Sequence, residues 1–342
     1  MGSGSALPGP PVTTEALIDA VEARFGGLRR RAVLALAQRM GIATRHVCRG
    51  WLASGEGPEP GRSNPELAAQ AARAALGQAG IEARDIGYLI GHTATPAQPL
   101  PANIALVADQ LGYGGPHLEL RQACTGFANA LMIAFGLLAS PSARPVVIVG
   151  SETGSVFLDP VRTLSDSGQL VNLVQMGDGA GAVVLAPAAA GTNRLSAAWF
   201  GAVGLHKSPG LQMRSGGSNR PCGGDGPLEF DHDYTAIADT GRHLFEAGVA
   251  AARSQGIDLA QMNHIIPHQV SGRIGDQIAD HFAMPRERFF VHADRVGNTG
   301  SAAIWLALDA LRNRGIGPGE RVLALGAEAT KHMHGGFVYE QG

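Results

Sequence analysis

The chain repeats one sequence pattern about half its length further on. Three matched pairs of segments occur in the same order: GIEARDIGYLIGH (80–92) with GIDLAQMNHIIPH (256–268), CTGFANAL (124–131) with NTGSAAIW (298–305), and VVIVGSE (146–152) with VLALGAE (322–328). The outer pairs are separated by 176 residues (256 minus 80, 322 minus 146) and the middle pair by 174 (298 minus 124). Ordered matches at nearly one separation indicate a duplication. We therefore expect two similar halves, 1–187 and 188–342, that pack about a pseudo-twofold axis.

Helical patterns alternate with short apolar runs in both halves. Apolar spacing predicts helices at 14–40, 65–80, 124–139, 236–255, 272–283 and 299–314. Apolar runs predict strands at 86–92, 117–121, 145–152, 179–187, 263–267, 289–292 and 321–327. This alternation is typical of α/β proteins whose sheets are covered on both faces. The stretches 153–176 and 204–235 lack a counterpart and are rich in Gly, Ser, Pro and Asp, so we expect them to border a pocket or a subunit interface.

Composition excludes several classes of protein. Hydrophobic residues make up 45% of the chain and charged residues 16%, with 48 glycines, which fits a tightly packed α/β protein. The formal net charge of −2 and the lack of a basic stripe argue against a nucleic-acid partner. No apolar run reaches the ~18 residues that a membrane span needs. Three scattered cysteines do not form a disulfide framework, and the opening MGSGSALPGPP lacks the features of a secretion signal, so we expect a cytoplasmic protein.

Cys124 is the strongest candidate nucleophile. It lies in RQACTG, between a predicted strand and a predicted helix. A helix N-terminus stabilises a thiolate, so this position is expected to lower the thiol pKa from ~8.5 towards the working pH. A lone cysteine is more often a small buried apolar residue. The turn and the repeat match favour a nucleophile here, whereas Cys48 and Cys222 have no such setting and are interpreted as structural.

His268 and Asn298 occupy related positions in the second half. His268 follows the apolar strand HIIP, and Asn298 lies in GNTGS before a helix. Taken singly, they would be interpreted as a partly buried histidine and as a helix N-cap. Together with Cys124 they suggest chemistry, because a neutral imidazole and an amide are a suitable donor pair for an enolate or another oxyanion.

These residues and their surroundings resemble one known family. Cys124 in ACTGFANAL, His268 in PHQ and Asn298 in GNTGSAA resemble the Cys–His–Asn set of 3-oxoacyl-acyl-carrier-protein synthase III, a thiolase-like condensing enzyme. Further segments that are similar to the family are GSGSALPGP (2–10), RMGIATRH (39–46) and MGDGAGAVVL (176–185). The resemblance spans nearly the whole chain. It implies a five-layer αβαβα fold built from two pseudo-repeated halves and a homodimer, and it makes the Gly/Ser-rich start native sequence rather than a linker.

The resemblance also implies a ping-pong reaction. Cys124 would take an acyl group from acyl-CoA or acyl-ACP, and its own backbone N–H would help to hold the first oxyanion. Malonyl-ACP or malonyl-CoA would then lose carbon dioxide to give an enolate that His268 and Asn298 stabilise. Attack of this enolate on the acyl group would give a 3-oxoacyl thioester. No metal or redox cofactor is implied, since phosphopantetheine arrives with the substrate.

Three departures from the family pattern point to a specialised lipid or secondary-metabolite pathway. GAEATKHMHGGF (326–337) replaces a triple-glycine stretch, so Thr330 or a neighbour must supply an oxyanion N–H. Leu100 before Pro101 stands where the family has an aromatic residue that gates the acyl pocket of the partner subunit, which implies a different acyl preference. Ala35 replaces a tryptophan that stacks on adenine, which favours a carrier-protein donor. Arg39 and Arg273 are candidates for binding carrier phosphates, or else ordinary surface charges.

Other interpretations remain open at this level. The enzyme could pass the acyl group to an alcohol or an amine without condensation, although Asn298 favours condensation. It could instead be a non-catalytic subunit of a heterodimeric synthase, although all three candidate residues are present. His332 and His334 make a weak metal pattern. His92, which the repeat matches to His268, lies near the site or is a strand-end histidine with a local partner.

Overall fold

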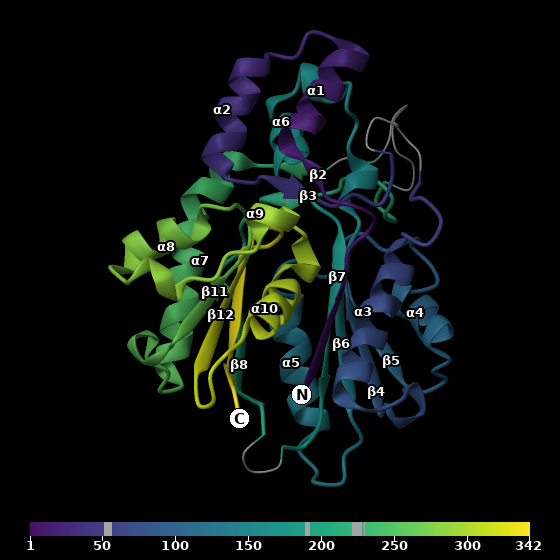
Figure 1. The fold of residues 1–342 in the computed structure, drawn as a ribbon, viewed down its shortest axis with the longest axis vertical. Coiled ribbons are helices and arrows are strands. Elements are labelled where there is room, and N and C mark those ends of the chain that lie inside the picture. The colour runs from purple at the N-terminus through teal and green to yellow at the C-terminus, as the bar shows by residue number, and fades with distance from the viewer. Residues whose placement is uncertain (51–56, 189–191, 221–227, 229) are drawn as a thin grey trace.

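The computed structural model describes residues 1–50, 57–188, 192–220, 228 and 230–342. The described residues form two larger sheets (Figure 1). The first has, in spatial order, β1 (Gly2–Ala6), β7 (Gly179–Leu185), β6 (Val146–Glu152), β4 (Tyr88–His92) and β5 (His117–Leu120). The second has β11 (His264–Pro267), β12 (Arg321–Glu328), β13 (Met333–Glu340) and β8 (Arg194–Ala202). The first sheet thus lies within 1–187 and the second within 188–342, while the boundary itself stays a prediction.

Helices cover both sheets and fill the space between them. The outer face of the first sheet packs on α3 (Asn64–Ala79) and α4 (Asn103–Leu111), and that of the second packs on α7 (Tyr234–Ser254) and α8 (Ile274–Phe282). Two central helices, α5 (Gly126–Leu137) and α10 (Ala303–Arg314), lie between the sheets and pack on both (Figure 1). The order is α, β, α, β, α, which confirms the five-layer thiolase-like fold.

The two halves share one strand topology. In the first sheet β4 pairs parallel with β6, which pairs antiparallel with β7, and β7 pairs antiparallel with β1. In the second sheet β11 pairs parallel with β12, which pairs antiparallel with β13, and β13 pairs antiparallel with β8. The matched segments therefore occupy equivalent strands, as the repeat predicts. Strands β8 and β13 were missed in the sequence, because their runs are interrupted by glycine and polar residues.

The strand predicted at 289–292 is reduced to one bridge between Phe289 and Ile265. This bridge is the parallel counterpart of the β4–β5 pairing. The predicted strand is wrong because the next backbone groups bind a side chain instead. Gln269 Oε1 accepts hydrogen bonds from the N–H groups of His292 (2.7 Å) and Ala293 (3.1 Å), and the chain then turns into α9 (Ala293–Val296).

The Gly/Ser-rich start is a structural strand rather than a linker. β1 pairs with β7 and lies directly against α3. A Cβ at Gly2 would lie 2.4 Å from the carbonyl oxygen of Ala75, and one at Gly4 would lie 2.4 Å from the Ala75 nitrogen. Only glycine allows β1 this approach, which explains a composition that resembles a flexible segment.

The single helix predicted at 14–40 is wrong. The chain forms α1 (Thr14–Phe25) and α2 (Arg30–Met40), because Gly26 and Gly27 take φ values of 65° and 75° that end the first helix. The segment 153–176 contains a helix, α6 (Ser167–Gln175), which packs on α1 and α2. The strand just before α1, β2 (Val12–Thr13), pairs with the strand that follows α2, β3 (Thr44–Arg45).

The segment 204–235 is only partly described. It contains the short pair β9 (Leu211–Gln212) and β10 (Asp231–His232), and Cys222 lies outside the described residues. The remaining predicted helices and strands are present with ends shifted by a few residues. None of the helices in the described ranges has an apolar stretch long enough to span a bilayer.

Candidate active site

Cys124 lies in the turn between β5 and the central helix α5, which begins at Gly126. The residue is partly exposed, whereas its neighbours Ala123 and Thr125 are buried. A Cβ at position 126 would lie 2.5 Å from Nδ1 of His92, so the turn rests directly on that imidazole. The sequence prediction of a strand–cysteine–helix arrangement is confirmed.

The predicted direction of the Cys124 pKa is wrong. Burial raises the pKa of the Cys124 thiol well above its usual range, and the nearby carboxylates of Glu328 and then Glu152 raise it further. A backbone hydrogen bond at the turn acts in the opposite direction but is the weakest contribution. The free protein therefore holds Cys124 as a thiol, and its proton must leave during the reaction.

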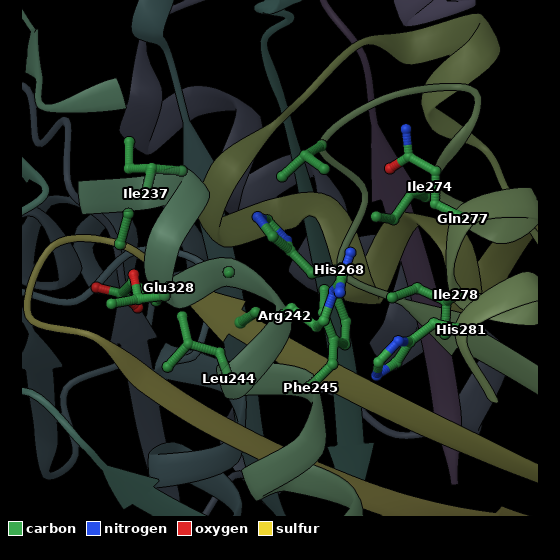
Figure 2. A pocket seen from close by; sticks show the side chains of 15 residues that line it. Ile237, Arg242, Leu244, Phe245, His268, Ile274, Gln277, Ile278, His281 and Glu328 are labelled. Carbon is green, nitrogen blue, oxygen red and sulfur yellow. The ribbon is translucent and has the colours of Figure 1, made fainter. Parts of the chain in front are cut away.

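His268 follows β11 and points into a cavity of about 340 Å³ (Figure 2). The side chain is 5% exposed, and burial lowers the pKa of His268 to about 4, so the imidazole is neutral at neutral pH. Most of the cavity wall is apolar and comes from α7, α8 and the segment after β11. These side chains are Ile237, Leu244, Phe245, Val270, Ile274 and Ile278. Polar groups that line the same cavity are Thr240, Arg242, Gln277, His281 and Glu328.

Asn298 lies in the turn between α9 and α10. Its backbone is fixed against the first half, because its N–H donates to Gln175 (2.7 Å) and its carbonyl accepts from Gly177 (3.1 Å). Its side-chain Oδ1 accepts the N–H of Gly300 at 3.1 Å. With Oδ1 engaged in this way, the Nδ2 amino group is left to donate to a ligand.

Two buried carboxylates tie these turns together, and neither was singled out in the sequence. Glu328 ends β12, lines the cavity of His268 and accepts the backbone N–H of Thr125 at 2.8 Å. Glu152 ends β6 and accepts the N–H of Ser301 at 3.0 Å. Ser301 Oγ also donates to the carbonyl of Gln122 at 3.3 Å. The segments that carry Cys124, His268 and Asn298 thus meet in one place. The shared final glutamate of VVIVGSE and VLALGAE was the signal for both residues.

Of the four other predicted residues, Arg273 lines a cavity and Thr330 binds a residue that lines the cavity of His268. Arg273 packs on Gly41 and lines a second cavity of about 500 Å³ beside α1 and α2. Thr330 Oγ1 donates to Oε1 of Glu328. Arg39 is exposed on α2 and lines neither cavity. Leu100 is 85% exposed and also lines neither cavity.

The two histidines of the weak metal pattern do not point to a ligand site. Nδ1 of His332 lies 3.0 Å from Thr240 Oγ1, and its Nε2 lies 2.9 Å from the carbonyl of Ser208. His334 packs against Gly201. In the part of the chain that the structure describes, His, Cys, Asp and Glu side chains do not gather into a metal-binding group.

Comparison with known proteins identifies the family. Residues 118–204 match the family model for 3-oxoacyl-acyl-carrier-protein synthase III, and residues 252–337 match the model for its C-terminal part. The beta-ketoacyl-acyl-carrier-protein synthase III of Rhizorhabdus wittichii is 33% identical over 99% of this chain and 96% of its own length. The corresponding synthase III 3 of Streptomyces coelicolor is 33% identical over 94% of this chain and 91% of its own.

Solved structures agree with this assignment. AbyA1, a tetronic acid condensing enzyme, superposes with a TM-score of 0.86 at 28% identity, over 99% of this chain and 98% of that one. The 3-oxoacyl-acyl-carrier-protein synthase III of Pseudomonas aeruginosa superposes with a TM-score of 0.80 at 27% identity, over 99% and 96% of the two chains. The chain described here therefore belongs to the 3-oxoacyl-acyl-carrier-protein synthase III family.

Proposed function

We propose that this protein takes an acyl group from a thioester onto Cys124 and joins it to a malonyl thioester by decarboxylative Claisen condensation. The observation that supports the proposal is that Glu328, Glu152 and Ser301 tie together the segments that carry Cys124, His268 and Asn298, at one end of the two central helices. In the first half-reaction the Cys124 sulfur attacks the thioester carbonyl, and the carbonyl–sulfur bond of the donor breaks. The Cys124 N–H is assigned to the oxyanion of this step.

The resting thiol decides how the proton moves. Because the Cys124 pKa is raised and the His268 pKa is lowered to about 4, the pair rests as neutral thiol and neutral imidazole. We assign His268 as the base that accepts the thiol proton while the carbonyl is attacked, and as the acid that gives it to the leaving thiolate.

In the second half-reaction the malonyl thioester loses carbon dioxide and leaves an enolate. An N–H of His268 and the Nδ2 amino group of Asn298 are assigned as donors to the enolate oxygen. The enolate carbon then attacks the acyl-Cys124 carbonyl, and the bond to Cys124 sulfur breaks to release a 3-oxoacyl thioester. Thr330 or a neighbour is assigned the second N–H for the acyl oxyanion. The reaction as written needs neither a metal nor a redox cofactor.

The substrates are proposed to be acyl-CoA or acyl-ACP and malonyl-ACP or malonyl-CoA. The cavity of His268 is mostly apolar, which suits a phosphopantetheine arm. Arg273 beside the second cavity and Arg39 on α2 are assigned to the carrier's phosphates. Leu100, exposed in the single chain, is assigned to a homodimer interface as the acyl gate of the partner subunit.

The setting we propose is a specialised lipid or secondary-metabolite pathway in a reducing cytoplasm. The likeness to a tetronic acid condensing enzyme and the replacement of the triple-glycine stretch by GAEATKHMHGGF support the pathway. The described cysteines, Cys48 and Cys124, are unpaired thiols, which supports the compartment.

The test is a product assay with purified protein, a panel of acyl thioesters and malonyl-ACP, scoring carbon dioxide and 3-oxoacyl product. We expect a product with wild-type protein, none with Cys124→Ala, and a loss of decarboxylation with Asn298→Ala. Transfer of the acyl group to an alcohol or an amine without carbon dioxide release would replace the condensation by simple acyl transfer. Lack of turnover with any donor would favour a non-catalytic subunit.

A further inference from the structure

The two strand-end glutamates are related by the repeat, since Glu152 and Glu328 are 176 residues apart (328 minus 152). Each binds the turn at the start of a central helix, at Thr125 before α5 and at Ser301 before α10. The contacts cross over between the halves. Glu328 of the second half binds Thr125 of the first half, and Glu152 of the first half binds Ser301 of the second.

Glu328 holds the Cys124 turn on both sides of the cysteine. Its Oε2 accepts the N–H (2.8 Å) and the hydroxyl (2.7 Å) of Thr125, which follows Cys124. Its Oε1 accepts the N–H of Ala123, which precedes Cys124, in a longer contact of 3.4 Å, and the hydroxyl of Thr330. One carboxylate therefore fixes the direction in which the Cys124 side chain leaves the backbone.

Glu152 holds the Asn298 turn in the same way. Its Oε2 accepts the N–H (3.0 Å) and the hydroxyl (2.8 Å) of Ser301, and its Oε1 accepts the hydroxyl of Thr95. A Cβ at Gly300 would lie 2.6 Å from Glu152 Oε2, so the carboxylate packs tightly under the turn. The N–H of Gly300 is in turn the group that orients the Asn298 amide.

Both carboxylates are buried, at 2% exposure for Glu328 and 5% for Glu152, and both oxygens of each accept hydrogen bonds. Neither forms an ion pair with the described residues. A buried carboxylate without a cation is costly unless hydrogen bonds compensate it. With its oxygens already engaged, each is better suited to holding a turn than to moving a proton.

We infer that Glu152 and Glu328 are reciprocal positioning residues: each half of the molecule supplies the carboxylate that fixes the other half's predicted catalytic turn. Glu328 positions Cys124, and Glu152 positions Asn298. The inference rests on the proposed function for the roles of Cys124 and Asn298. It goes beyond that function because neither carboxylate touches a reacting atom and each is assigned to a different half-reaction.

The arrangement has a separate electrostatic consequence for Cys124. The titratable groups beside its turn are Glu328 and Glu152, whose charges act on the thiol, and His92 behind Gly126, while His268 lies in the cavity that Glu328 also lines. Both imidazoles are neutral, because burial lowers the pKa of His268 to about 4 and that of His92 to about 3. Removing a negative charge from this set must lower the thiol pKa. Glu328→Gln should lower it more than Glu152→Gln, because Glu328 has the larger effect on the thiol.

The experiment separates charge from position with paired variants. Glu328→Gln keeps a carbonyl oxygen for Thr125, presents its amide to the Thr330 hydroxyl and loses only the longer contact with the Ala123 N–H, whereas Glu328→Ala removes the charge and all of these contacts. Glu152→Gln and Glu152→Ala form the second pair. Asp309→Ala is the matched control, because Asp309 is a buried carboxylate that accepts the hydroxyls of Ser3 (2.6 Å) and Ser5 (2.5 Å) on β1 instead.

Two rates and one pH profile are measured for each variant. We expect Glu328→Ala to slow acylation of Cys124 about tenfold or more and to leave the rate of malonyl decarboxylation nearly unchanged. Glu152→Ala should slow malonyl decarboxylation by a similar factor and leave the rate of acylation nearly unchanged. Glu328→Gln should shift the pH profile of Cys124 alkylation by iodoacetamide to lower pH. Asp309→Ala should leave both rates and the profile unchanged, whatever it does to the melting temperature.

A second pair of variants distinguishes loss of the Glu328 contact from a general loss of folding. Thr125→Ser keeps the hydroxyl that binds Glu328 and should retain acylation, whereas Thr125→Val should lose it. Equal losses of both steps in Glu328→Ala and Glu152→Ala, or unchanged rates and an unchanged alkylation profile, would overturn the inference. If wild-type protein takes up no acyl group, the proposed function fails, and the alkylation profiles alone then decide whether Glu328 acts on Cys124.

Discussion

Trp305 Nε1 donates a hydrogen bond to Nε2 of His92 at 3.0 Å across the central layer of the molecule. His92 ends β4 of the first half, and Trp305 belongs to α10 of the second. The indole ring also stacks on Phe337, with ring centroids 5.6 Å apart. His92 is the repeat counterpart of His268, yet it is buried under the Cys124 turn with Trp305 of the other half as its partner. One member of the histidine pair thus joins the halves, while the other faces the cavity.

This relationship predicts the effect of Trp305→Phe. The substitution keeps an aromatic ring but leaves Nε2 of buried His92 without its donor. Trp199→Phe is the matched control, because Trp199 is 4% exposed and its Nε1 has no partner among the described residues. We expect Trp305→Phe to lower the free energy of unfolding by about 1–3 kcal/mol more than Trp199→Phe in urea titrations. Equal losses would contradict a role for this hydrogen bond.

His268 predicts a pH dependence of stability. Its pKa is lowered to about 4 in the folded state from about 6.5 when unfolded, so between these values the unfolded state binds the additional proton. Stability should therefore rise with pH across this window. His268→Asn should remove about 2 kcal/mol of the difference between pH 5 and pH 7 in urea unfolding. Parallel curves for the variant and wild type would argue against a buried neutral His268.

The two described cysteines should differ in reactivity. Burial and the charge of Asp178 raise the pKa of the Cys48 thiol, and Cys48 is fully buried, whereas Cys124 is partly exposed. We expect iodoacetamide at mildly alkaline pH to modify Cys124 before Cys48 in the folded protein. Peptide mapping of the labelled protein checks this order, and preferential labelling of Cys48 would contradict the described burial.

Arg273 predicts how the carrier is recognised. Charge reversal in Arg273→Glu should raise the KM for an acyl-CoA donor about tenfold, because phosphate contacts are charge-assisted. An acyl-pantetheine donor without phosphates should be unaffected. Arg253→Glu, on the exposed end of α7, serves as the control. An equal rise in KM for both donors would place Arg273 in folding rather than in phosphate binding.

The sequence predicted the layers and the candidate site better than the local details. The repeat placed Cys124 and Asn298 at equivalent helix starts and His268 at a strand end, because a duplicated fold brings equivalent chain ends together. The break at Gly26 and Gly27 depends on backbone angles that apolar spacing does not encode. The loss of strand 289–292 depends on a distant glutamine side chain.

The pKa of Cys124 was mispredicted for a related reason. The sequence shows a helix start, which favours a thiolate, but it does not show how deeply that helix is buried. Nor does it place Glu328 and Glu152 beside the sulfur. Tertiary burial and two charges from other strands outweigh the local effect of the helix.

Whether Cys124 carries the acyl group of a condensation is tested by the intact mass of the protein after incubation with a panel of acyl thioesters, with and without malonyl-ACP. We expect one acyl adduct on Cys124 that persists alone and is discharged as a 3-oxoacyl product when malonyl-ACP is added. An adduct that malonyl-ACP does not discharge, or an alkylatable Cys124 that accepts no acyl group from any donor, would contradict this expectation.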